Sequence, residues 1–351
     1  MQVVQGIVDI GERLGVTYRL NTSISRILLS EDGVRAKGIV LENGETLTAD
    51  IVIVNADLIY AYTNLLPPTA YSKSLTQREA SCSSISFYWA LNKQIPELSA
   101  HNIFLAEDYR ESFDSIFKKH QIPDQPSFYV NVPSRVDPSA APSGCDSVVV
   151  LVPVGHLLDS ASETHKGTPG SPDLKQDWNN MVSTARSTIL KTIESRLHIT
   201  LSEHIVHETL NTPLTWKDTF NLDRGAILGL SHSFFNVLCF RPKTKHSSIE
   251  DLYFVGASTH PGTGVPIVLA GARLIAEEIL KEHGERIPWE EEKSAKVVVV
   301  KEIDRVQGSG GMWVYYLLVI AFAIFVMSVD FRGEIGGWEW SKLRGGFVGD
   351  W

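Results

Sequence analysis

The sequence predicts a mixed α/β fold, α+β in character, with a membrane helix near the C-terminus. Short apolar runs alternate with turn signals up to Asp57, and an apolar strand after Leu252 turns through glycines into a helix. The segment from Trp313 to Val329 contains no charged residue. With 351 residues, of which 43% are hydrophobic, the chain is long enough for two domains and a sizeable core.

The N-terminal part predicts a small antiparallel sheet. Val16 to Asp57 alternates apolar runs with the turn signals Glu31-Asp32-Gly33 and Glu42-Asn43-Gly44. Ile51 to Val54 is apolar throughout, which predicts a fully buried strand. Asp57 follows this strand and suits the N-cap of a helix.

The middle of the chain is rich in aromatic residues and proline. Strands are predicted at Ser84 to Leu91, Ser127 to Val132 and Val148 to Val154. His156 to Asp173 has the composition of a surface loop, and a helix is predicted from Leu174 to Leu197. One stripe of that helix has core patterning: Trp178, Met181, Val182, Ala185, Ile189, Ile193 and Leu197.

The glycine-rich turn after Leu252 is the strongest local signal. Glycines at 256, 262 and 264 let the backbone approach a ligand, and Pro266 suits the first turn of a helix running to about Lys281. The helix N-terminus offers free N–H groups and a partial positive charge. The pattern is typical of a cofactor-binding turn, and an ordinary strand-turn-helix junction is the alternative. The third glycine of a dinucleotide fingerprint is missing here and after Gly308.

The uncharged run predicts a membrane-embedded helix, for which 17 residues is the short end of the range. Aromatic residues near both ends resemble those found at membrane interfaces. A buried core helix is the alternative. The flanking cations show no asymmetry that fixes an orientation.

Charge and motif patterns exclude several classes of function. The net charge of −9 and the absence of a dense Lys/Arg run argue against nucleic acid as a partner. The pattern around His204 and His207 favours a solvated face over a metal site, so no metal is predicted. Gly225 to Gly229 lacks the central serine of a hydrolase elbow.

Several segments resemble the phytoene desaturases of bacteria and fungi, members of the FAD-dependent amine-oxidase-like superfamily. Besides the glycine turn, the resemblance rests on residues 49–57, 81–89, 101–105, 133–142 and 222–232, in the family's order. Met1 to Gly15 resembles the helix that precedes a small sheet in the family. Nothing here corresponds to the strand, glycine fingerprint and helix that open the family's proteins. We therefore expect the C-terminal part of a desaturase, from a truncated gene model or a naturally shortened product.

The resemblance implies a partial two-domain FAD-dependent oxidoreductase fold with a C-terminal membrane helix. The expected segments follow in chain order: the remainder of the FAD-binding domain at 1–59, a substrate-binding domain at 60–245, a C-terminal FAD-binding segment at 246–283, a linker at 284–311, the transmembrane helix at 312–330 and a tail at 331–351.

The resemblance also implies which residues lie near the cofactor, FAD. Contacts mostly through the backbone are expected at Gly256, Ala257, Thr259, Gly264, Val265, Pro266 and Ile267. His260 would lie near the flavin or its phosphates, or would serve only the packing of the turn. Asn55 and Asp57 are expected near the cofactor, with the N-cap role as the alternative for Asp57. No catalytic acid or base is assigned.

The implied activity is FAD-dependent carotenoid desaturation, from phytoene to lycopene or a more desaturated acyclic carotene. The implied partners are an acyclic C40 carotene, membrane lipid, and quinone or oxygen as electron acceptor, at an intracellular endomembrane facing the cytoplasm. A non-catalytic membrane-anchored fragment, which binds carotene or lipid or pairs with an intact desaturase, is the alternative. A carotenoid isomerase or a retinol saturase is a third reading. Six aromatic residues are candidates for a substrate tunnel or for plain core: Phe87, Trp89, Phe104, Phe128, Phe234 and Phe235.

Overall fold

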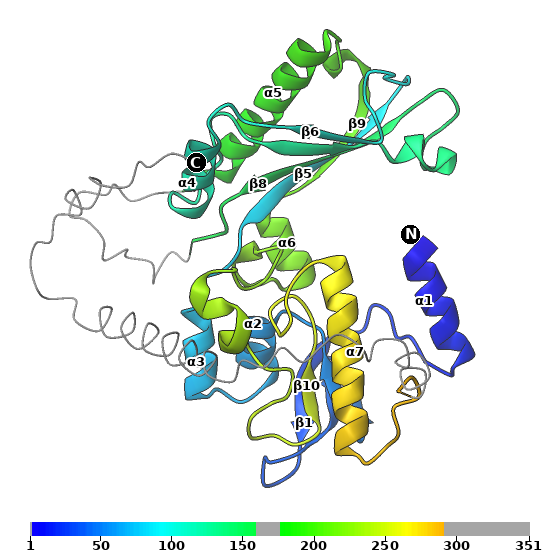
Figure 1. Ribbon diagram of the computed structural model, residues 1–351, viewed down its shortest axis with the longest axis vertical. Coiled ribbons are helices and arrows are strands. Elements are labelled where there is room, and N and C mark those ends of the chain that lie inside the picture. Colours follow the sequence, from blue (N-terminus) through cyan, green and yellow to red (C-terminus); the bar gives the residue numbers. More distant parts are fainter. Residues whose placement is uncertain (1, 159–175, 291–351) are drawn as a thin grey trace, which may run out of the picture. The chain divides into compact units, whose positions relative to one another are not determined.

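The computed structural model describes residues 2–158 and 176–290 (Figure 1). Residues 1–286 form one compact unit, and a second unit begins at Ile287. Within the described ranges, no helix has both the length and the apolar character needed to cross a membrane. The transmembrane helix predicted at 312–330, the tail and most of the predicted linker and loop lie outside the described residues.

The structure has a mixed α/β composition, as the sequence predicts. The helices are α1 (Gln2–Arg13), α2 (Leu58–Tyr60), α3 (Ala70–Thr76), α4 (Tyr109–Phe117), α5 (Trp178–Leu197), α6 (Pro213–Phe220) and α7 (Val265–Glu282). The strands are β1 (Ile24–Leu29), β2 (Ala36–Leu41), β3 (Thr46–Thr48), β4 (Val52–Val54), β5 (Ser83–Leu91), β6 (His101–Phe104), β7 (Phe128–Asn131), β8 (Ser147–Val154), β9 (Ile205–Asn211) and β10 (Leu252–Phe254).

The small antiparallel sheet predicted for the N-terminal part is confirmed, in the order β1-β2-β3. The turn between β1 and β2 is fixed by Asp32, whose carboxylate accepts from the Ser30 hydroxyl at 2.6 Å and from the Val34 amide at 3.2 Å. Gly38 has a φ of +139°, and a Cβ there would lie 1.9 Å from the carbonyl oxygen of Leu47. The close approach of β2 and β3 therefore requires glycine at this position.

Strands β4 and β10 form a parallel pair although they lie far apart in sequence. Leu252 pairs with Val52 and Phe254 pairs with Val54. The prediction of a fully buried strand is wrong at Ile53, which is 52% exposed, because successive side chains of a strand point to opposite faces. Only the Val52 and Val54 face is buried.

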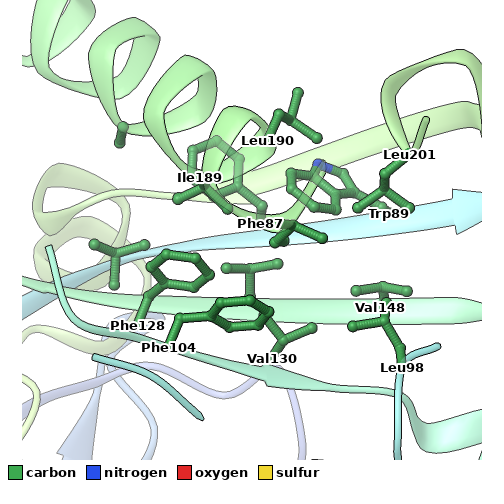
Figure 2. Close-up of a cluster of buried hydrophobic side chains, with 14 of the residues drawn as sticks. Phe87, Trp89, Leu98, Phe104, Phe128, Val130, Val148, Ile189, Leu190 and Leu201 are labelled. Carbon is green, nitrogen blue, oxygen red and sulfur yellow. The ribbon is translucent and has the colours of Figure 1, made fainter. Parts of the chain in front are cut away.

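The second sheet has the strand order β6-β7-β8-β5-β9 and is antiparallel throughout. Its core cluster contains Phe87, Trp89, Phe104 and Phe128, so these four candidates are plain core (Figure 2). The three strands predicted in this region are confirmed. Strands β6 and β9 were not predicted, since their charged or polar residues hide the β pattern.

Helix α5 lies against this core through the predicted stripe. Met181, Ala185, Ile189 and Ile193 are buried, and the stripe's other three residues are partly buried against the same cluster. The helix begins at Trp178 and not at Leu174, because Asp177 caps it by accepting from the Asn180 amide at 3.1 Å.

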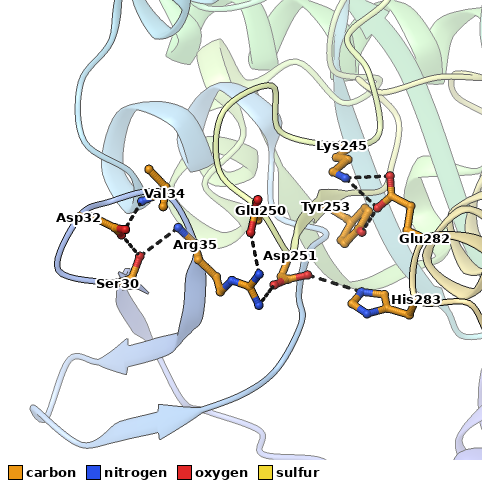
Figure 3. Close-up of polar contacts among 10 residues, drawn as sticks. All are labelled: Ser30, Asp32, Val34, Arg35, Lys245, Glu250, Asp251, Tyr253, Glu282 and His283. Atoms are coloured by element: carbon orange, nitrogen blue, oxygen red, sulfur yellow. Dashed lines mark hydrogen bonds and ion pairs between the residues drawn. The ribbon is translucent and has the colours of Figure 1, made fainter.

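Helix α7 is fixed at its C-terminal end by polar contacts (Figure 3). Glu282 accepts from the Lys245 ammonium at 2.7 Å and from the Tyr253 hydroxyl. His283 lies 3.5 Å from Asp251, which also pairs with Arg35 at 3.1 Å. The end of α7, strand β10 and the β1–β2 turn region are thereby held together.

Candidate functional site

The ends of β4 and β10 line one cavity of about 110 Å³. Because the two strands are parallel, their carboxyl ends meet at the same edge, where ligands bind in open α/β sheets. Residues 54–58 come from one side and residues 254–259 from the other; Leu222, Ile227 and Gly229 complete the lining. Five of the predicted site residues therefore lie around one cavity: Asn55, Asp57, Gly256, Ala257 and Thr259.

Asn55 joins the two strand ends directly. Its side-chain amide donates to the carbonyl oxygen of Val255 at 2.8 Å, and the Val255 amide donates to the carbonyl oxygen of Val54 at 2.9 Å. Gly256 follows with a φ of +133°, and a Cβ there would lie 3.0 Å from the Asn55 side-chain nitrogen. The positive φ and the crowding of Asn55 therefore both favour glycine at 256.

The amides of Gly256 and Ala257 donate to no other group among the described residues. A backbone N–H group that lines a cavity without an acceptor is suited to an electronegative ligand atom. Together with the missing side chain at 256, these amides fit the backbone contacts expected for FAD.

Arg241 lies beneath the turn and was not predicted. The residue is 3% exposed, and its guanidinium donates to the carbonyl oxygens of Thr259 at 3.1 Å, Asn236 at 2.7 Å and Ala257. Burial lowers the pKa of Arg241. Burial, followed by the charge of Arg241, also lowers the pKa of His232. The buried cation holds the turn's carbonyl oxygens and adds positive potential beside it.

Asp57 is the N-cap of α2 and also lies in the cavity lining. Its carboxylate accepts from the Tyr60 amide at 3.0 Å. Burial, with a further contribution from the negative charge of Asp223, raises the pKa of Asp57 to about 6. A half-buried carboxyl that titrates near neutrality and lines a cavity is a candidate functional group.

The remaining predicted residues lie outside the cavity lining. His260, Gly264, Val265, Pro266 and Ile267 are exposed and belong to the turn and the first turn of α7. Gly264 caps the helix with a φ of +107°, and Pro266 occupies the first turn as predicted. The start of α7 thus presents open backbone and apolar side chains to solvent.

The sequence did not predict the cavity residues Leu222, Ile227 and Gly229, nor Arg241 beneath the turn. Gly229 belongs to a segment quoted for the family resemblance, and a Cβ there would lie 2.2 Å from the Ser258 hydroxyl oxygen. No local pattern marks Arg241, because its partners come from two other segments.

The described residues hold no cluster of three or more potential metal ligands. His207 is exposed, and Glu208 accepts from the Trp89 ring nitrogen at 2.5 Å and from Arg186 at 2.8 Å. Glu208 therefore ties β9 to β5 and α5.

Among the tunnel candidates, Phe234 and Phe235 are 65% and 57% exposed, so the core interpretation is wrong for both.

No protein-family model matches the chain. The proteins to which the chain is similar in sequence include phytoene desaturases of fungi and a zeta-carotene-forming phytoene desaturase of Myxococcus xanthus. They include the phytoene desaturase of Fusarium fujikuroi, 54% identical over 339 residues, and that of Cercospora nicotianae, 51% identical over 401 residues. The predicted resemblance to phytoene desaturases is confirmed.

The two alignments cover 91% and 98% of this chain, and the chain spans 60% and 63% of these relatives' own lengths. Among solved structures, an oxidoreductase from Methanosarcina mazei is 15% identical with a TM-score of 0.45, covering 73% of this chain and 49% of that one. At that level the likeness defines neither the fold nor the function.

Proposed function

We propose that the chain serves FAD-dependent carotenoid desaturation, in which phytoene is converted to lycopene or to a more desaturated acyclic carotene. The observation that carries the proposal is the 54% identity to a phytoene desaturase, over a region that includes both halves of the cavity. The enzyme would be an oxidoreductase acting on CH–CH bonds. The segments expected at 1–59 and 246–283 would supply the flavin side, and residues 60–245 the substrate side.

FAD, when bound, supplies the acceptor for the two hydrogens, which no side chain provides. The amides of Gly256 and Ala257 would donate to it, with Thr259 and Asn55 beside them. The exposed backbone at Gly264, Val265, Pro266 and Ile267 would lie against the cofactor, with His260 close by. The positive end of α7 and the buried charge of Arg241 both favour an anionic ligand.

The substrate would be an acyclic C40 carotene, which dissolves in bilayers and not in water. Membrane lipid is therefore a proposed partner, with a location on an intracellular endomembrane facing the cytoplasm. Quinone or oxygen would accept the electrons. The membrane helix proposed at 312–330 would keep the protein at its source of substrate.

The test is reconstitution of the 351-residue chain in liposomes with FAD and phytoene. The expected result is bound flavin and a carotene that absorbs at longer wavelength. Gly256→Ala, which perturbs the edge of the cavity, is compared with the unsubstituted chain in the same assay. Bound flavin without any longer-wavelength carotene would contradict desaturation by this chain, and a product of unchanged mass would favour an isomerase. Reduction of retinol by the same preparation would favour a retinol saturase.

One observation favours a non-catalytic role. A cavity of about 110 Å³ is far smaller than the roughly 300–1,000 Å³ typical of ligand pockets, and the start of α7 is exposed. The alternative is a membrane-anchored fragment that binds carotene or lipid, or that pairs with an intact desaturase. A purified chain that takes up no FAD on reconstitution would support this alternative.

A further inference from the structure

An exposed aromatic cluster lies in residues 234–240, here called the aromatic loop. Phe234 is 65% exposed, Phe235 57% and Leu238 78%. The rings of Phe234, Phe235 and Phe240 contact one another, with centroids 5.2–5.6 Å apart. Such a concentration of apolar side chains on an exposed face is typical of an interaction site.

The aromatic loop also lacks charge. No Asp, Glu, Lys or Arg occurs among the 16 residues between Arg224 and Arg241. Protein–protein interfaces also use phenylalanine, but they combine it with Arg and a polar rim, whereas phenylalanine and leucine without any charge suit a hydrocarbon boundary. The exposed Lys243 follows shortly after the loop, where a cation suits anionic headgroups.

The loop is held in this conformation from beneath. Asn236 is 2% exposed, and its amide donates to the carbonyl oxygen of Glu79 and to the Ser231 hydroxyl, both at 3.0 Å. Arg78 donates to the carbonyl oxygen of Phe240 at 2.9 Å. The polar side chain therefore points inward while the neighbouring rings face water, the reverse of ordinary burial.

The base of the loop is shared with the candidate site. The guanidinium of Arg241 binds the carbonyl oxygen of Asn236 at 2.7 Å and those of Ala257 and Thr259 in the glycine turn. A surface that engages the loop would therefore lie next to the segment that lines the cavity.

We propose that the aromatic loop docks on a lipid bilayer, with Phe234, Phe235 and Leu238 entering the boundary between headgroups and acyl chains. The helix predicted at 312–330 would tether the same chain to that bilayer and raise the loop's effective concentration there. The inference rests on the proposed function for its purpose, because a carotene substrate would enter from the bilayer at this point. The docking itself requires no flavin.

Cys239 provides a native reporter, since it is exposed within the loop. In the full-length chain with Cys82→Ser and Cys145→Ser, Cys239 is labelled with an environment-sensitive fluorophore. Vesicles of phosphatidylcholine, alone or with phosphatidylserine, are then added. The expected result is a shift of emission to shorter wavelength and protection from aqueous iodide. A matched control carries Cys239→Ser and the label at Ser187→Cys, an exposed position on α5, and should show neither change.

When Phe234→Ser, Phe235→Ser and Leu238→Ser are added, the lipid concentration needed to protect the label from iodide should rise by at least about tenfold. If the triple variant does not fold, Leu238→Ser alone is used, and it should also raise the lipid concentration needed for protection. A label at 239 that stays accessible to iodide while the chain sediments with vesicles overturns the proposal, as does a chain that does not bind them. Protection that depends on protein concentration and not on lipid would indicate a second copy instead. The FAD content of the same samples tests the proposed function separately.

Discussion

The guanidinium of Arg241 donates a hydrogen bond to the carbonyl oxygen of Thr259 at 3.1 Å, from below the glycine turn. The same side chain binds Ala257 and Asn236, so one buried cation connects the turn with the aromatic loop. Loss of this side chain should therefore loosen two segments together.

Arg241→Met should reduce the free energy of unfolding by about 2–4 kcal/mol, because buried carbonyl oxygens lose their donor. Hydrogen exchange at residues 256–262 should accelerate, and Arg241→Lys should restore it only in part. Arg135→Met is the control, since Arg135 also donates to buried carbonyl oxygens and pairs with Asp146 in the other core. It should destabilise the chain without changing exchange in the turn. Unchanged hydrogen exchange in Arg241→Met would show that the turn keeps its conformation without this side chain.

Gly256→Ala should impair FAD binding by at least about tenfold and destabilise the chain by roughly 1–3 kcal/mol. The new Cβ meets Asn55 at 3.0 Å, and the φ of +133° is unfavourable for alanine. Gly44→Ala is the matched control, because Gly44 also has a positive φ but a Cβ there meets nothing within 4 Å. Flavin titration and urea denaturation of both variants provide the check; equal effects would rule out a special role for position 256.

The pKa of Asp57 makes stability depend on pH. Its native value of about 6 lies above the unfolded value of 3.8, so the folded state binds the extra proton between these values. The free energy of unfolding should therefore fall by up to about 3 kcal/mol as pH rises from about 4 to 6. Above pH 6, Asp57 should cause no further change.

Asp57→Asn keeps the N-cap and removes the ionisation, so it should be more stable than the parent chain above pH 6. Denaturant midpoints across this pH range measure the difference. Asp177→Asn, at the exposed cap of α5, should leave the pH dependence as it is. A parent chain whose stability does not fall between pH 4 and 6, relative to Asp57→Asn, would contradict the raised pKa.

Phe87→Ala should reduce the free energy of unfolding by about 3–5 kcal/mol, because the ring projects from β5 and is fully buried in the core cluster (Figure 2). Ile103→Ala on β6 removes an apolar side chain that is 72% exposed, and should change the free energy of unfolding by no more than about 0.5 kcal/mol. Equilibrium unfolding in urea separates the two. A small effect at Phe87 would mean that the core repacks around the loss.

Elements and site residues could be predicted from the sequence where the pattern that marks them is local. Strands β5 and β8 were predicted because their apolar runs carry a local β pattern. Strand β9 was missed because much of it is exposed at the sheet edge and its polar residues resemble a solvated loop. Arg241 has no local signal, since its partners at 236, 257 and 259 are brought together only by the fold.

The cavity itself was predictable only in halves. The glycine turn and the residues after β4 were each expected near a ligand, and the parallel pairing of β4 with β10 brings them together. For Phe234 and Phe235 the local signal was misleading. Their hydrophobicity favoured burial, while the inward hydrogen bonds of Asn236 turn the loop the other way.

The pairing of Asn55 with Val255 also sets an order of events during protein synthesis. These two residues are 200 positions apart, so the first strand of the pair leaves the ribosome long before its partner exists. At about 5–20 residues per second, that delay is roughly 10–40 s. The cavity between the two strand ends cannot form during this interval, so a ligand that needs both halves of its lining can bind only after Val255 has emerged.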